Sequence, residues 1–416
     1  MTRTTYAGRH RALPLRCRTR KETTIHMLQI NRIRCRAIVL AAMLGVLSLD
    51  ASAAMEQPAG RADTVRAVRD RGAPVGDVVI FDRASGGYDT SDAYKWGRNS
   101  WTCESLTDTA TGACPTEQVW EKSGTSTDIR LSFTEEKTGA TAALTLQGAN
   151  GYQRHRDCSG NDSPIGVATN RLPLEMAQSI AWSGCRPEEL VYDGRLLYVT
   201  IPAAELKKLP SGGIWKANLR LNLRQWLDTG PSPTLGVFQA AITLDTTDKN
   251  NIQVYLPEFT SATPTVDLKL RKLPNGSRMA GTSNVDMCLY DGYNSQSTWF
   301  DVSASDGLTI DRRDNGQYSV LLDQDKSGNY ESRVDYTVSL EYAGKKIALQ
   351  NNETVRLQGV NNSTGRSVTL PGISVPVVCT PTPLILETPE FQSVWKRPGT
   401  YSNKLTITFT PSSASL

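Results

Sequence analysis

The chain has 416 residues, with 46 lysines and arginines, 42 aspartates and glutamates, and a formal net charge of +4. This basic balance comes from residues 1–54, which hold ten basic and two acidic side chains. The remainder has 36 basic and 40 acidic groups, and its net charge is therefore −4. A net acidic chain argues against a general nucleic-acid binder.

The first residues have the features of an export signal. A basic stretch at 32–36 precedes a short apolar core at 37–49, and Ala-Ser-Ala at 51–53 matches an A-x-A cleavage site. This pattern is typical of a secretory signal peptide and is too short for a membrane span. Because Met27 is a second plausible start, the residues before it are interpreted as a misassigned start, and 1–54 as leader and signal peptide.

Six of the eight cysteines lie beyond the leader. An even number in an oxidising compartment suggests three disulfides, although several connectivities are possible. Zinc is not expected, because the chain has no C-x-x-C pair and almost no histidine. The order of the cysteines along the chain favours the pairs Cys103–Cys114, Cys158–Cys185 and Cys288–Cys379.

Short runs of alternating polar and apolar residues, separated by Gly, Asn, Asp, Ser and Pro, dominate the chain after the leader. Their spacing and turn chemistry predict an all-β fold of immunoglobulin-like β-sandwich type. Helical periodicity is scarce, and segment 202–209 fits one or two helical turns. The predicted strands include 129–136, 142–148, 196–203, 238–247, 265–273, 316–323 and 335–344.

The length after the leader, about 362 residues, suggests two domains or three small ones. The clearest boundary lies where a strand ends, two prolines follow within eight residues, and a new strand begins at Thr265. A short linker stiffened by proline fits this stretch. We therefore predict a first domain at 55–252, a linker at 253–264 and a second domain at 265–416.

The last residues of the chain have the period-two pattern of a half-buried strand. Leu405, Ile407 and Phe409 lie on one face, and a lysine and threonines lie on the other. If an immunoglobulin-type domain ends at its penultimate strand, an apolar groove remains along an unpaired edge, which must be covered in water. A strand from another chain can cover it. The alternative is a complete sandwich whose last strand ends the chain.

Segment 215–226 alternates in the same way. Its polar face carries Lys216, Arg220 and Arg224 between apolar residues. The simpler interpretation is a solvent-facing strand surface. The alternative is a basic stripe that binds an acidic ligand such as a sialylated glycan, because the arginine guanidinium holds a carboxylate bidentately.

Catalytic motifs are missing from the sequence. His155 is the single histidine beyond the leader, and neither G-x-S-x-G nor H-E-x-x-H occurs. Segment 323–335 begins like a calcium loop, but Val334 occupies the position of the bidentate glutamate. We therefore expect no enzymatic activity, no cofactor and no bound metal.

Five blocks carry a family resemblance: IPAAELKKLPSGGIWKANLRL (201–221), DKNNIQVYLPEFTSATPTVDLKL (248–270), SNVDMCLYDGYNSQS (283–297), SVPVVC (374–379) and GTYSNKLTITFTPS (399–412). In this order they resemble the CblD-like minor tip subunits of colonisation-factor fimbriae, which belong to the alternate chaperone–usher class. The resemblance runs from about Ile201 to the end. Before Ile201 it is limited to sandwich-like patterning and cysteine pairs.

The resemblance implies a protein that is exported through the periplasm to the fimbrial tip at the cell surface, where it initiates pilus assembly. An adhesin domain at 55–252 would bind a host glycan or glycoprotein. An incomplete pilin domain at 265–416 would accept a donor strand from a periplasmic chaperone and then, at the outer-membrane usher, from the major pilin subunit. Leu405, Ile407 and Phe409 would border the donor-strand groove, and Cys288–Cys379 would staple the pilin domain.

A tip subunit needs no donor segment, and the polar stretch 55–76 lacks the long apolar alternation of one. The family implies a basic receptor patch at the distal end of the first domain. The loop 227–236, where this patch would place arginines, has none, so Arg220, Arg224 and Lys216 are the nearest substitutes.

Trp96 and Trp101 are the aromatic alternative for receptor binding, because an exposed indole ring can stack on a sugar. Two other functions stay open for the whole chain. The first is a secreted carbohydrate-active enzyme with a β-sandwich module. The second is a structural pilus cap without adhesive activity.

Overall fold

The structure, a computed structural model, describes residues 54–415 with gaps. The predicted signal peptide and the predicted pair Cys158–Cys185 lie outside the described residues. None of the helices in the described part has the length and apolar character that a bilayer crossing requires. The gaps are 75, 93–94, 155–160, 162–163, 165, 167–169, 179–192, 262, 275, 311–312 and 315.

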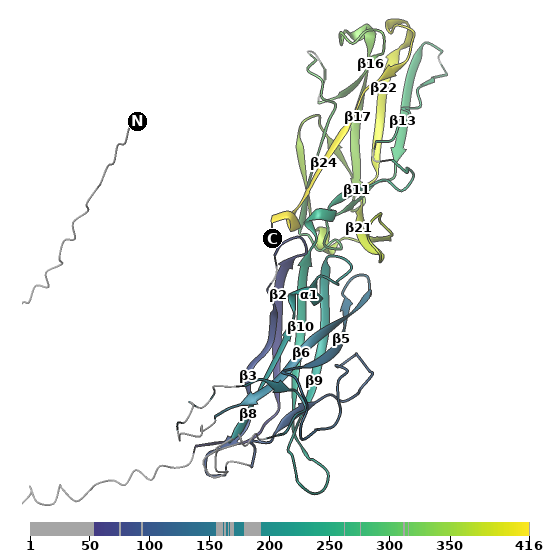
Figure 1. The fold of residues 1–416 in the computed structure, drawn as a ribbon. Helices are drawn as coiled ribbons and strands as arrows, with labels where there is room; N and C mark the ends of the chain where they lie inside the picture. Colours follow the sequence, from purple (N-terminus) through teal and green to yellow (C-terminus); the bar gives the residue numbers. More distant parts are fainter. Residues whose placement is uncertain are drawn as a thin grey trace, which may run out of the picture. The chain divides into compact units, whose positions relative to one another are not determined.

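The first strands of the described chain form one ten-stranded sheet with the order β1-β3-β8-β6-β5-β9-β10-β2 (Figure 1). β4 pairs with β9, β7 pairs with β6, and β2 runs parallel to β10. The elements are β1 (Met55–Glu56), β2 (Arg61–Asp70), β3 (Val78–Asp89), β4 (Ser100–Thr102), β5 (Thr127–Glu135), β6 (Thr141–Tyr152), β7 (Leu172–Pro173), β8 (Gly194–Ile201), α1 (Ala203–Leu206), β9 (Gly213–Arg224) and β10 (Thr234–Thr247).

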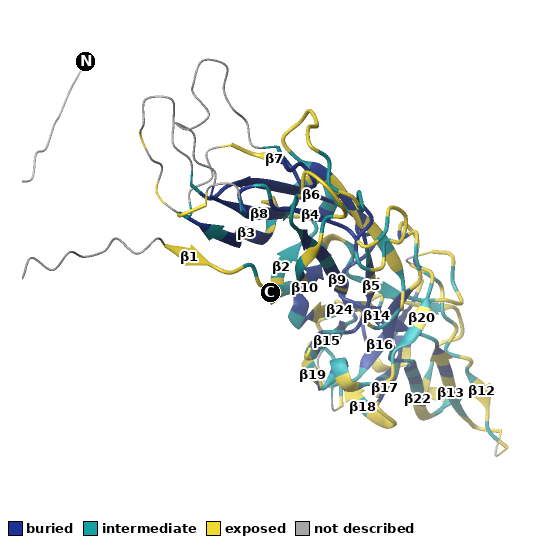
Figure 2. Cartoon of the chain, turned by 90° about the horizontal axis from the view of Figure 1, so that it is seen from below, coloured by how far each residue is buried: buried dark blue, intermediate teal, exposed yellow. Residues whose placement is uncertain are grey.

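Alternating side chains of this sheet build its core. On β9, every second residue from Trp215 to Leu223 is buried, and β5 shows the same alternation. Figure 2 shows β8 largely buried, and half of the residues of β3 are buried. The Trp101 and Phe238 rings meet edge to face, with centroids 5.4 Å apart. Each fully buried large apolar side chain contributes about 1.5–3 kcal/mol, so the period-two pattern holds the sheet in one register.

The later strands form three further sheets in the described chain: β11-β14-β21-β20, β19-β15-β24, and β12-β13-β22-β17-β16-β23 with β18 on β17. The strands are β11 (Gln253–Tyr255), β12 (Arg271–Lys272), β13 (Arg278–Val285), β14 (Cys288–Tyr290), β15 (Trp299–Ser305), β16 (Tyr318–Leu322), β17 (Arg333–Tyr342), β18 (Lys345–Leu349), β19 (Thr354–Gln358), β20 (Arg366–Val368), β21 (Val377–Pro381), β22 (Leu384–Gln392), β23 (Tyr401–Ser402) and β24 (Thr406–Pro411).

The predicted all-β fold in two tandem domains is confirmed, since strands up to β10 pair only among themselves and those from β11 onward do the same in the described chain. β11 lies inside the segment predicted as a linker and pairs with β14. Segment 202–209 forms one helical turn, α1. The predicted strand 265–273 is wrong for most of its length, because only Arg271 and Lys272 find a strand partner, β13.

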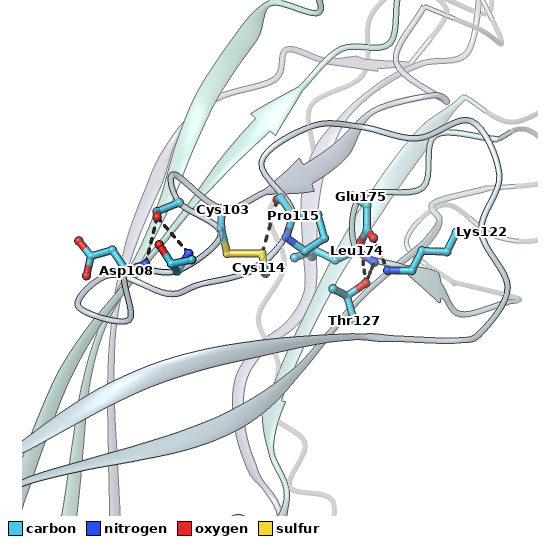
Figure 3. Close-up of a disulfide and its surroundings, with 10 residues drawn as sticks. Cys103, Asp108, Cys114, Pro115, Lys122, Thr127, Leu174 and Glu175 are labelled. Atoms are coloured by element: carbon cyan, nitrogen blue, oxygen red, sulfur yellow. Dashed lines mark hydrogen bonds and ion pairs between the residues drawn. A yellow bond between two sulfur atoms is a disulfide. The ribbon is translucent and has the colours of Figure 1, made fainter.

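Two predicted disulfides are confirmed. Cys103–Cys114 closes a loop of the first domain (Figure 3), and Cys288–Cys379 joins β14 to β21. Their sequence separations of 11 and 91 residues differ widely. The second therefore removes more conformational freedom from the unfolded chain.

A buried loop at 291–297, shortly after Cys288 of the second disulfide, is held together by hydrogen bonds. The Asp291 carboxylate accepts the backbone N–H groups of Tyr293 at 2.9 Å, Ser295 at 2.9 Å and Ser297 at 3.1 Å. Desolvation raises the pKa of Asp291. Asn294, at a φ of 54°, donates to the Gly212 carbonyl at 2.8 Å, so the loop is bonded to the chain just before β9.

Replacing Cys288 and Cys379 together by serine lowers the free energy of unfolding by up to about 4.6 kcal/mol, against about 2.8 kcal/mol for Cys103 and Cys114, because the longer loop gains more entropy when opened. Chemical denaturation of both double variants, each under oxidising conditions, measures the two losses. A larger loss on removal of Cys103–Cys114 contradicts this ranking.

Candidate functional site

The C-terminal strand β24 is paired along one flank only. It pairs with β15 from Phe300–Pro411 to Ser305–Thr406, and no strand of the described chain lies on its other side. Just before it, β23 pairs with β16, again on one side. An exposed strand edge of this kind presents unpaired backbone N–H and C=O groups to any strand that reaches it.

The facing segment, 264–270, has the side-chain pattern of a strand without a strand's pairing. Val266 and Leu268 are half-buried, whereas Thr265 and Asp267 are exposed. The segment is nevertheless not part of any sheet. The alternation of polar and apolar residues favours an extended backbone. A strand also needs a neighbouring strand to which its backbone can hydrogen-bond, and the described chain supplies none at this segment.

An apolar groove with a volume of about 730 Å³ lies between these two segments. Leu405 and Ile407 line it from one side, and Val266 and Leu268 from the other. Its remaining apolar lining includes Val254, Leu256, Phe259, Val285, Met287, Val320, Leu384 and Leu386.

Two of the three predicted groove residues line this groove, Leu405 and Ile407. Phe409 lies outside its lining. Its ring packs edge-on against Phe300 of β15, with centroids 4.7 Å apart and planes at 75°. The site can therefore hold an extended strand whose backbone bonds to a free edge and whose alternate apolar side chains enter the groove.

The predicted receptor residues lie along the outer face of β9, and their charges are partly compensated. The Lys216 ammonium lies 2.7 Å from a Glu136 oxygen, and Arg220 Nε lies 3.1 Å from a Glu104 oxygen. Arg224 is half-buried. At about 3.3 Å per strand residue, Lys216 and Arg224 are roughly 26 Å apart, too far to hold one carboxylate together.

The prediction that Trp96 and Trp101 are exposed stacking residues is wrong. Their exposures are 5% and 0%, because Trp101 is part of the sheet core and Lys95 covers the Trp96 ring. The structure instead brings together Trp120 and Trp226, which no sequence motif indicated. They are 106 positions apart, so no local pattern could have joined them.

The segment that resembles a calcium loop bonds to its own chain. Asp325 accepts the Ser327 backbone N–H at 3.0 Å and the Ser332 hydroxyl at 2.5 Å. These hydrogen bonds lower the pKa of Asp325 to about 2. Within the described ranges, no three His, Cys, Asp or Glu side chains are grouped as metal ligands.

The chain thus has two tandem β domains, and the second has an apolar groove beside a strand edge that is paired on one side only. Residues 50–249 match the first-domain model, and residues 252–413 the second-domain model, of CfaE, a subunit of CFA/I fimbriae. The chain belongs to this family, the CfaE family.

Similar proteins agree with this assignment. The CFA/I fimbrial subunit CfaE of Escherichia coli is 33% identical over 332 residues, which are 77% of this chain and 82% of that protein. The crystal structure of CfaE, the adhesive subunit of the CFA/I fimbria of enterotoxigenic E. coli, matches with a TM-score of 0.69 and 29% identity, covering 86% of this chain and 94% of that one.

A further solved structure, from work on a chaperone–tip adhesin complex in CFA/I fimbriae biogenesis, matches with a TM-score of 0.63 and 29% identity. It covers 86% of this chain and 98% of that chain. These relatives support a chaperone–usher tip adhesin. The CblD-like label is finer than these relatives show.

Replacing Lys216 or Arg220 by alanine changes the free energy of unfolding by less than about 1 kcal/mol, because both ion pairs are solvent-exposed. Leu219→Ala on the buried face of the same strand costs about 2–5 kcal/mol. Chemical denaturation measures all three. Losses above about 2 kcal/mol for the charged residues would show that the stripe is structural.

Proposed function

We propose that this protein is a minor, CblD-like fimbrial tip subunit that initiates pilus assembly and binds a host-surface glycan or glycoprotein. Its second domain accepts a donor strand from a periplasmic chaperone and then, at the outer-membrane usher, from the major pilin subunit. The mature protein reaches the fimbrial tip at the cell surface. The observation that carries the proposal is the apolar groove between segment 264–270 and β24.

The two walls of the groove support strand donation rather than binding of a compact ligand. Both walls are extended chain, and both alternate half-buried apolar with exposed polar residues. An inserted strand would pair with these walls and place its own alternate side chains against Ile407 and Val266. Backbone bonding then supplies affinity, and the spacing of the side chains supplies register.

The described N-terminal segment supports a position at the tip. Residues 61–70 form β2, which pairs in parallel with β10 over ten residue pairs. Val65 and Ala67 pack against the core of the first domain, and Arg71 forms an ion pair with Asp248. This segment is engaged by its own domain and is not free to complete a neighbouring subunit.

Receptor binding by the first domain is supported by membership of a family whose relative is described as an adhesive subunit. Lys216, Arg220 and Arg224 remain proposed contacts, and an anionic glycan would have to compete with Glu136 and Glu104 for two of them. These relatives are adhesins rather than enzymes. A structural cap without adhesive activity is the competing function.

A donor strand with alternating apolar residues, fused to the C-terminus, raises the melting temperature of the chain by roughly 10 °C or more, because it fills the groove and pairs the free edge. Ile407→Asp abolishes this gain by burying a carboxylate against apolar side chains. Thr408→Asp, the matched control on the exposed face, retains it. Calorimetry with and without the fused strand measures each.

Two results oppose strand donation. One is a lone chain that is monomeric and as stable as the fused form. The other is equal loss of the gain in Ile407→Asp and Thr408→Asp.

The same fused protein separates an adhesin from a cap and from an enzyme. An adhesin binds immobilised glycans without changing them, a cap binds none, and a carbohydrate-active enzyme releases sugar products. Glycan-array binding followed by mass spectrometry of the glycans distinguishes the three. Products that accumulate with time would replace the adhesin proposal by the enzyme.

A further inference from the structure

Two tryptophan rings form an aromatic surface at one end of the first domain. Trp120 follows the loop closed by Cys103–Cys114, and Trp226 is the second residue of the loop between β9 and β10; their ring centroids are 5.6 Å apart. Trp120 is 38% exposed. Because β10 runs from this loop toward Asp248 and the second domain, the pair lies at the opposite end of that strand, where the β9–β10 loop projects (Figure 1).

Polar groups border the two rings. The Arg98 guanidinium carbon lies 5.3 Å from the Trp120 centroid. Arg98 also forms an ion pair with Asp228 at 3.1 Å, and Trp226 Nε1 donates to Asp228 at 3.3 Å. The Asp228 side chain is nevertheless 76% exposed, so its carboxylate is oriented beside the rings and still faces solvent.

The segment that carries Trp120 is held rigidly. The Val119 N–H donates to the Glu175 carbonyl at 3.1 Å, and the Ala177 N–H donates to the Val119 carbonyl at 2.9 Å. Lys122 is bonded to the Glu175 carboxylate, which also accepts the Thr127 hydroxyl at 2.6 Å (Figure 3). Both sides of the tryptophan are thus tied to buried Glu175.

The segments that carry Trp226 and Arg98 are fixed to each other. The Gln225 side chain donates to the Lys95 carbonyl at 3.0 Å, and the Gln225 N–H donates to the Pro233 carbonyl at 3.1 Å. Buried Arg195 donates to the Gly97 carbonyl at 2.6 Å. A rigid aromatic surface loses little entropy when a ligand binds.

We propose that Trp120, Trp226, Arg98 and Asp228 form a binding site for a neutral hexopyranose. The apolar C–H face of the sugar stacks on the indole rings, and its hydroxyl groups donate to the Asp228 carboxylate. An acidic sugar is disfavoured, because Arg98 is already neutralised by Asp228 and Glu121 lies next to Trp120 in the chain. This inference rests on the proposed adhesin function and names its ligand class.

The test uses the full mature chain with the fused donor strand. A glycan array with neutral and sialylated glycans identifies the bound probe, and titration with that free oligosaccharide gives the affinity. Trp120→Ala weakens binding of a neutral glycan about tenfold or more. Trp395→Ala, which removes a 55% exposed tryptophan of the second domain, leaves it unchanged.

Asp228→Asn is a second variant for the case that Trp120→Ala does not fold. It removes the carboxylate charge at an exposed position and is also expected to weaken neutral-glycan binding about tenfold, with an unchanged melting temperature. Unchanged affinity in a folded Trp120→Ala protein, or in Asp228→Asn, overturns the site and leaves the adhesin function intact.

Two further outcomes would overturn the aromatic site. Binding of sialylated glycans alone, lost on replacing Lys216 and Arg220, overturns the aromatic site in favour of the β9 stripe. Failure of the native protein to bind any glycan overturns the adhesin function and the site together.

Discussion

The second domain depends on an apolar groove that its own described chain leaves open. Segment 264–270 and β24 face each other with half-buried apolar side chains, and neither has a strand on the side of the groove. A bare edge beside apolar surface invites pairing with another strand. The free energy of folding and the free energy of binding are therefore linked, because whatever fills the groove stabilises the folded domain.

In the first domain, a strand of the same domain covers the edge of β10. β2 covers the flank of β10 with ten residue pairs and contributes Val65 and Ala67 to the core. The open flank of β2 carries charged side chains such as Arg61 and Arg66, which discourage pairing with another sheet. One domain is closed by an N-terminal strand, and the other keeps an open strand edge in the described chain. This difference agrees with the fibre-initiating role that we propose.

The proposed aromatic site and the bonds to the second domain lie at different ends of β9. The loop at 291–297 bonds to Gly212, just before β9, and it is built around the buried carboxylate of Asp291. The aromatic pair lies where β9 ends, twelve residues further along. Strands are stiff over this length, so the proposed receptor surface at one end would stay presented while the other end is bonded to the second domain.

Alternation alone was enough to predict most of the strands, the inward face of β9 and the apolar face of the last strand, because side-chain direction in an extended chain depends only on parity. The order of the cysteines was enough to predict two disulfides. Neither pattern could show whether segment 265–273 would pair with a neighbouring strand. Neither could show that the Phe409 ring would pack on Phe300. Nor could they show that Trp101 is buried while Trp120 is exposed. Pairing, burial and the meeting of Trp120 with Trp226 depend on contacts between residues far apart in the chain, which only the tertiary structure specifies.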